Sequence, residues 1–242
     1  MRAAPLLVPL IAFASSLTDA APKDKPREDK PREDKPQDRF EEGMLTRFHM
    51  HENYGIVRAI ERLLLRGRLD DAKPLAAAIG EAPDEAGMAT YATQSAEVRS
   101  RAVDLSHAKS LDEAIRLEAR LVLACAGCHT DSGVVPDLAK APPLPPDRDT
   151  VEARMARHMW AADRLWVGIV ADSPDAWANG LDLLASGSRT WPKLTAAQTP
   201  FAQRMQRTAQ SARRAKGTTL ASRSATYGEL LSTCAGCHTT PP

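Results

Sequence analysis

The chain has 242 residues, of which 43% are hydrophobic, 26% charged and only 5% aromatic. The first two fractions are ordinary for a soluble globular protein, and the shortage of aromatic residues favours helix over strand. The formal net charge of +1 gives no electrostatic basis for binding nucleic acid. We therefore expect a helical protein of one or two domains that does not bind nucleic acid.

The first 20 residues are predicted to be a secretory signal peptide. Arg2 supplies the positive start, a mostly apolar stretch covers residues 3–17, and Thr18-Asp19-Ala20 offers a cleavage site. The apolar stretch is too short for a comfortable membrane span, although an uncleaved anchor is the alternative. We expect export to the periplasm and no membrane span.

Two stretches are predicted to be linkers. Residues 21–40 include the repeat KDKPREDKPREDKPQD, which has no apolar side chain except proline and is expected to be disordered. The second linker, over 139–149, contains the proline-rich sequence APPLPPDRD. Between and after the linkers lie two segments of similar length, 41–138 and 150–242, which we interpret as two domains.

Each segment is predicted to contain four helices. In the first, an apolar stripe at helical spacing (Ile56, Ile60, Leu63, Leu64) is followed by helices over about 70–79, from after Pro83 to Leu105, and from Ser110 to the first cysteines. In the second, Ser173-Pro174, Thr195 with Gln198, and Thr219 are expected helix starts. The predicted fold class is all-α, with two tandem four-helix bundles.

The two segments resemble copies of one unit. At an offset of 105 residues, Met50 aligns with Met155, Ile60 with Leu165, Leu64 with Ile169 and Asp70 with Asp175. Both segments end in the sequence CAGCHT, at an offset of 109. Internal duplication is our hypothesis, and convergence on the motif alone is the alternative.

All four cysteines lie in two Cys-x-x-Cys-His motifs: Cys125, Cys128 and His129 form the first, and Cys234, Cys237 and His238 form the second. This spacing is the attachment signature of c-type haem: two thiols on one helical turn reach the two vinyl groups, and the histidine binds iron. A thioredoxin-like site would need a strand-to-helix context, a zinc ribbon would need strand-rich knuckles, and disulfides would not explain the repeated histidine. The sequence therefore predicts two covalent haem groups.

A motif at the end of the last helix of a four-helix bundle resembles the class II c-type cytochromes, the cytochrome c-prime family. The resemblance covers both segments, and the tandem arrangement departs from the usual single unit. It implies that the first helix of each bundle crosses the distal face of the haem. The implied sixth ligands are His158, with Met155 as the alternative, in the second unit, and His51, with His49 or Met50 as alternatives, in the first. At the offset of 105, His158 aligns with Asn53, which is not a normal axial ligand.

Three functions follow from this interpretation. The first is transfer of single electrons between periplasmic redox partners, with no enzymatic activity. The second is binding or sensing of nitric oxide or carbon monoxide at a five-coordinate haem, suggested by Asn53. The third, peroxide reduction, ranks lowest because no distal acid-base pair stands out in the sequence.

Overall fold

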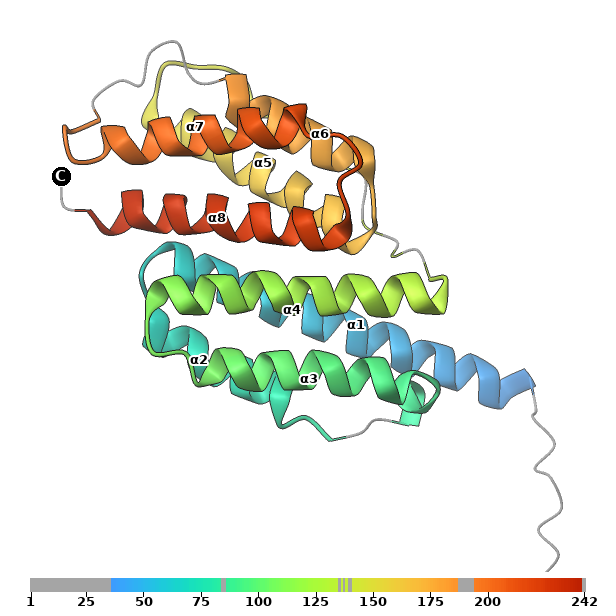
Figure 1. Ribbon diagram of the computed structural model, residues 1–242. Helices are drawn as coiled ribbons and strands as arrows, with labels where there is room; N and C mark the ends of the chain where they lie inside the picture. Colours follow the sequence, from blue (N-terminus) through green and yellow to red (C-terminus); the bar gives the residue numbers. More distant parts are fainter. Residues whose placement is uncertain are drawn as a thin grey trace, which may run out of the picture.

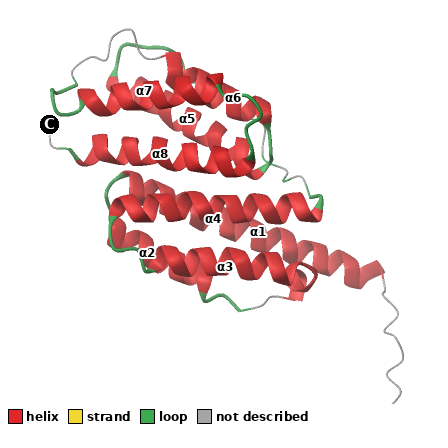
Figure 2. Ribbon diagram, viewed as in Figure 1, coloured by secondary structure: helices red, strands yellow, loops and turns green. Residues whose placement is uncertain are grey.

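The structure is a computed structural model, and it describes residues 36–83, 86–134, 136, 138, 141–186 and 194–240. Over these residues every regular element is a helix and no strand is present, as Figure 2 shows, which confirms the all-α prediction. The elements are α1 (Pro36–Leu65), α2 (Leu69–Gly80), the 3₁₀ helix η1 (Ala86–Tyr91), α3 (Ala92–Ser106), α4 (Leu111–Ser132), α5 (Val151–Val170), α6 (Pro174–Ser186), α7 (Thr199–Arg214) and α8 (Leu220–Thr239). The predicted signal peptide lies outside the described residues.

Helix starts follow the capping residues of the sequence. The Ser110 hydroxyl accepts a hydrogen bond from the Glu113 amide at 3.2 Å, and the Thr219 hydroxyl accepts one from the Ser222 amide. Ser173 caps α6 in the same way, just ahead of Pro174. These side chains satisfy amide groups that the first helical turn leaves without partners. The capping residues therefore account for where three of the helices begin.

The helices differ from the sequence prediction in three places. Helix α7 begins at Thr199, four residues after Thr195, although the expected hydrogen bonds between Thr195 and Gln198 form. Helix α1 begins at Pro36, so residues 36–40 of the expected disordered linker are helical. Proline suits the first turn of a helix because its missing amide proton is not needed there, and no proline follows it within α1. The expected third helix is divided into η1 and α3.

Helices α1–α4 and α5–α8 occupy the two halves of the molecule, and α4 and α8 lie side by side where the halves meet (Figure 1). These two helices run in opposite directions. The Ser232 hydroxyl near the end of α8 donates to the Asp112 carboxylate at the start of α4 at 2.6 Å, and the Ser224 hydroxyl donates to the Ala119 carbonyl at 2.7 Å. The C-terminal ends of α4 and α8 therefore lie at opposite ends of the interface.

The hydrophobic core is continuous across both halves. Its fully buried members include Ile60, Leu121, Leu165, Ile169 and Leu230, which come from α1, α4, α5 and α8. Burial of such large apolar side chains holds the halves against each other, at about 1.5–3 kcal/mol for each side chain. None of the helices in the described part of the chain has the length and apolar character needed to cross a membrane.

The stretch before α5 also packs on the second half. The Trp160 indole donates to the Pro142 carbonyl at 2.9 Å, and Arg157 donates to the Pro145 carbonyl at 2.8 Å. Residues 141–149 therefore lie along the surface of α5, although their composition alone indicates only a linker.

Candidate functional site

Both Cys-x-x-Cys-His motifs occupy the last turns of long helices, the first in α4 and the second in α8. The helical repeat of 3.6 residues puts the two cysteines of each motif on one face, with the histidine directly after. All four thiols are free, and each cysteine is partly exposed. The structure thus presents two similar groups of two thiols and one imidazole.

In the first motif, the end of α4 orients the histidine. Gly133 adopts a left-handed conformation with φ of 66°, which turns the chain back at the helix end. The Val134 carbonyl thereby comes within 3.3 Å of Nδ1 of His129. A donor proton on Nδ1 leaves the Nε2 lone pair available as a ligand. Burial lowers the pKa of His129, which favours this neutral form.

The cysteines of the two motifs have matching environments. Burial raises the pKa of Cys125 and of Cys234 to about 12. Burial also raises the pKa of Cys128 and Cys237. High thiol pKa values disfavour the thiolate, so these cysteines are not activated in the manner of a redox-active dithiol site.

The second motif differs from the first in what covers it. A side chain at Gly236, between the two cysteines, would meet the ring of Phe201 from α7, with the nearest ring atom 2.3 Å from the Cβ position. The matching Gly127 of the first motif has nothing within 4 Å of that position. Phe201 was not identified from the sequence, because no local pattern indicates that the start of α7 reaches α8.

His158 of α5, the expected sixth ligand of the second unit, lies within electrostatic range of His238 of α8. The pKa of His158 is lowered to about 4, mainly by burial and next by the charge of His238, with smaller effects of Arg154 and Arg157. Burial and then the charge of Arg66 lower the pKa of His238. At both histidines burial therefore favours the neutral imidazole. Met155, the alternative, is half-buried on the same helix.

The candidate ligands of the first unit lie on α1. The side-chain amide of Asn53 donates to Nε2 of His49 at 2.8 Å, so these two residues share a helix face. His49 and Met50 are half-buried, whereas His51 is exposed. The exposure of His51 shows that closeness in sequence to Asn53 does not predict which histidine shares its helix face, because helix geometry puts residues four apart on one face.

The two motifs are far apart. Taking the Ser232–Asp112 contact as a reference, His129 lies 17 residues further along α4 (129 − 112), and His238 lies six residues further along α8 in the opposite direction (238 − 232). A rise of about 1.5 Å per residue separates the two histidines by roughly 35 Å along the interface. The antiparallel packing of α4 and α8 alone produces this separation.

Between the motifs lies a buried polar cluster, formed by Arg58, Glu61, Glu118 and Tyr227. All four are buried, the last three with no exposed surface. Arg58 donates to Glu61 and also to Asp163 of α5, whose side chain is 41% exposed. The Arg58 guanidinium also lies over the Trp166 ring, 5.5 Å from its centroid.

This cluster was not predicted from the sequence, although the sequence pattern contains a signal for it. Glu61 is flanked by Val57, Ile60 and Leu64 at helical spacing, and Glu118 lies within the buried stripe of α4. A charged residue on an apolar stripe at the 3.6-residue period indicates a buried charge that needs a partner.

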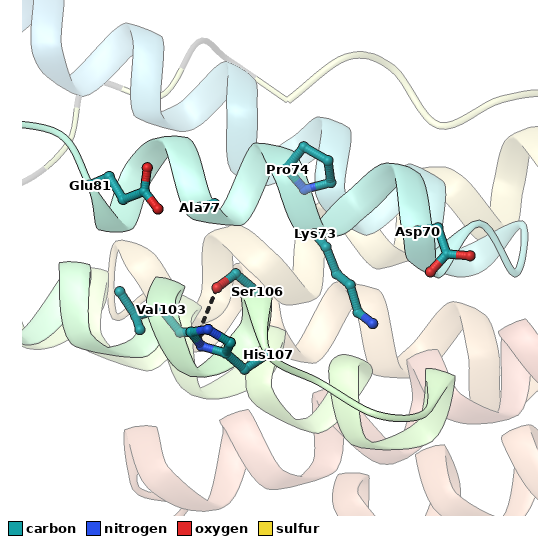
Figure 3. A pocket seen from close by; sticks show the side chains of 8 residues that line it. All are labelled: Asp70, Lys73, Pro74, Ala77, Glu81, Val103, Ser106 and His107. Carbon is teal, nitrogen blue, oxygen red and sulfur yellow. Dashed lines mark hydrogen bonds between the residues drawn. The ribbon is translucent and has the colours of Figure 1, made fainter. Parts of the chain in front are cut away.

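A surface depression of about 330 Å³ lies elsewhere, between α2 and α3 (Figure 3). It is lined by Asp70, Lys73, Pro74, Ala77, Glu81, Val103, Ser106 and His107. None of these residues belongs to either motif. Over the described residues, no group of three or more His, Cys, Asp or Glu side chains could hold a metal ion by itself.

Comparisons with protein-family models, with curated proteins and with solved structures find no match to this chain.

Proposed function

We propose that this protein is an exported c-type cytochrome of two tandem four-helix bundles, which holds one haem at each motif and carries single electrons between redox partner proteins. The observation that carries the proposal is the repeated site. The same two thiols and imidazole recur at the ends of α4 and α8, with the same thiol environments and no disulfide.

The residues at both motifs fit a covalently attached haem. Two neutral thiols on one helix face suit thioether formation, and Nε2 of His129 is left free by the contact of Nδ1 with Val134. Haem iron takes at most two ligands from the protein, so a site of one or two histidines is the expected arrangement. A haem bound there would supply a one-electron iron couple.

At the second motif, His158 and His238 are the two iron ligands of the proposal. They come from α5 and α8, and each is neutral at pH 7 because burial and the neighbouring positive charges lower its pKa. An imidazole binds iron in its neutral form, so this environment favours the form of both rings that can act as a ligand. Two strong ligands leave no open position for a gas or peroxide, which favours electron transfer.

At the first motif, the half-buried His49 and Met50 of α1 are the candidates for the sixth ligand, and the exposed His51 becomes the weakest of the three. The hydrogen bond from Asn53 to Nε2 of His49 occupies the nitrogen that would bind iron. This bond is the specific observation that favours the second candidate function, gas binding at a five-coordinate haem in the first unit.

The test is the optical spectrum of the purified protein, oxidised and reduced, with and without carbon monoxide, together with a pyridine haemochrome count. Two haems per chain that are low-spin and indifferent to carbon monoxide are expected for the electron carrier. A response of one haem to carbon monoxide would favour gas binding at the first unit. A chain without covalent haem would overturn both functions.

A further inference from the structure

The buried polar cluster has more carboxyl groups than its single cation can balance. Arg58 faces Glu61 on its own helix and Asp163 on α5, and Glu118 approaches from α4. Both oxygens of Glu118 and Oε1 of Glu61 are buried without a hydrogen-bond partner. An ionised carboxylate buried in this way is strongly destabilising, whereas a protonated one costs far less. The arrangement therefore favours a proton on one of the two glutamates.

The surrounding helices provide few other charges. Tyr227 on α8 lies near Glu61, and its hydroxyl lowers the pKa of Glu61, which opposes the effect of burial. On α1, Arg62 and Tyr54 act weakly, the first on Glu61 and the second on Arg58. Burial raises the pKa of Glu118 well above its usual range, the charge of Glu61 raises it further, and Arg58 opposes both effects.

The cluster lies between the two motifs. Glu118 precedes Cys125 on α4 by seven residues (125 − 118), and Tyr227 precedes Cys234 on α8 by the same number (234 − 227), a rise of about 10 Å in each case. The charge of Glu118 raises the pKa of the Cys125 thiol, and the charge of Glu61 raises the pKa of the Cys234 thiol. A change of charge in the cluster therefore changes the electrostatic potential at both motifs.

We propose that Glu61 and Glu118 form a buried proton-binding site that holds one shared proton at neutral pH and binds it more tightly when an iron at either motif is reduced. The dependence of this proton on iron reduction rests on the proposed function. A one-electron reduction of an iron held at either motif, with the electron supplied by a redox partner, would lower the positive charge at that motif by one. At a pH where the oxidised protein has lost the shared proton, one proton from solvent would then add back to the carboxyl pair, with no other bond changed. The half-exposed Asp163, bound to Arg58, links the pair to the surface.

The first experiment is infrared spectroscopy of the full chain at pH 7, which detects the C=O stretch of a protonated carboxyl group. The wild type should show this band. Glu118→Gln and Glu61→Gln should each remove it, because one buried glutamate then remains beside Arg58, while the half-exposed Asp163 is solvated. Glu229→Gln, which changes an exposed carboxylate on α8, should keep it. Absence of the band in the wild type, or its survival in Glu61→Gln, would overturn the shared proton. Circular dichroism of each variant checks that it folds.

The second experiment measures the midpoint potentials of the haem-loaded protein against pH. They should fall as pH rises through the range in which the pair loses its proton, and Glu118→Gln should remove that slope while Glu229→Gln retains it. An unchanged slope in Glu118→Gln would overturn the redox link. If the chain carries no haem, the proposed function and the redox link both fail, and the infrared band still decides whether the proton site exists.

Discussion

Arg58 of α1 and Asp163 of α5 form an ion pair, and they are 105 residues apart, which is the offset that aligns the two halves of the sequence. Each residue therefore contacts its own counterpart. The α4–α8 interface is reciprocal in the same way at the offset of 109: Ser224 contacts Ala119, and their counterparts Ile115 and Gly228 also approach each other. A pair of repeats related by a two-fold axis produces such contacts.

Arg58→Met should destabilise the protein more than any single change of its partners. The substitution leaves two buried glutamates without a cation, which costs about 3–5 kcal/mol of unfolding free energy. Asp163→Asn should cost less than about 1 kcal/mol, because Asp163 is 41% exposed. Urea unfolding at pH 7 measures both values. Equal, small effects would mean that the cluster does not need its cation.

Stability should fall as pH rises above the usual carboxyl pKa. The pKa of Glu118 in the folded state is raised above the ordinary value of 4.5. At a pH between the ordinary pKa and the folded-state pKa, the folded chain therefore holds a proton that the unfolded chain has lost. The unfolding free energy then decreases by about 1.4 kcal/mol per pH unit until the folded pKa is reached. Glu118→Gln should lack this decrease. Unfolding curves of both proteins at several pH values give the difference, and parallel pH profiles would contradict the prediction.

Removal of one motif should remove one haem and leave the other. Because the two sites are roughly 35 Å apart along antiparallel helices, neither should depend on the other for attachment. Cys125→Ala with Cys128→Ala, and separately Cys234→Ala with Cys237→Ala, should each give one haem per chain. Intact mass and pyridine haemochrome absorbance count the haems. Two haems in either double variant would contradict the assignment of that motif.

His158→Ala should open the second iron to carbon monoxide, since it removes the ring that lies beside His238. One haem per chain should then respond in the reduced spectrum. His107→Ala changes an exposed histidine in the α2–α3 depression and should have no effect. If the His158→Ala protein remains indifferent to carbon monoxide, Met155 becomes the better candidate for the sixth ligand.

Gly236 and Gly127 occupy the same position in the two motifs and should respond oppositely to alanine. At Gly236 the new methyl group meets the ring of Phe201, an overpacking that costs about 1–3 kcal/mol. At Gly127 there is open space, and alanine should stabilise the helix by about 0.5–1 kcal/mol. The midpoints of urea unfolding compare the two variants. A destabilised Gly127→Ala would show that this motif too has a close neighbour.

Local chemistry in the sequence determined the helical class, the capped starts of α4, α6 and α8, and the position of each Cys-x-x-Cys-His motif in a last helical turn. Those features depend on hydrophobic period, capping side chains and short spacing, all of which lie within a few residues. The role of His158 as a sixth ligand was expected only through the family resemblance.

Tertiary structure alone decided the antiparallel pairing of α4 and α8, and with it the separation of the two motifs. It also brought Arg58, Glu61, Glu118 and Tyr227 together from three helices, and laid Phe201 against Gly236. These contacts join residues that are distant in the chain, so they depend on how whole helix faces pack and not on any local pattern. The same distinction explains why His51 was preferred to His49 from its position in the sequence, although His51 is exposed in the structure.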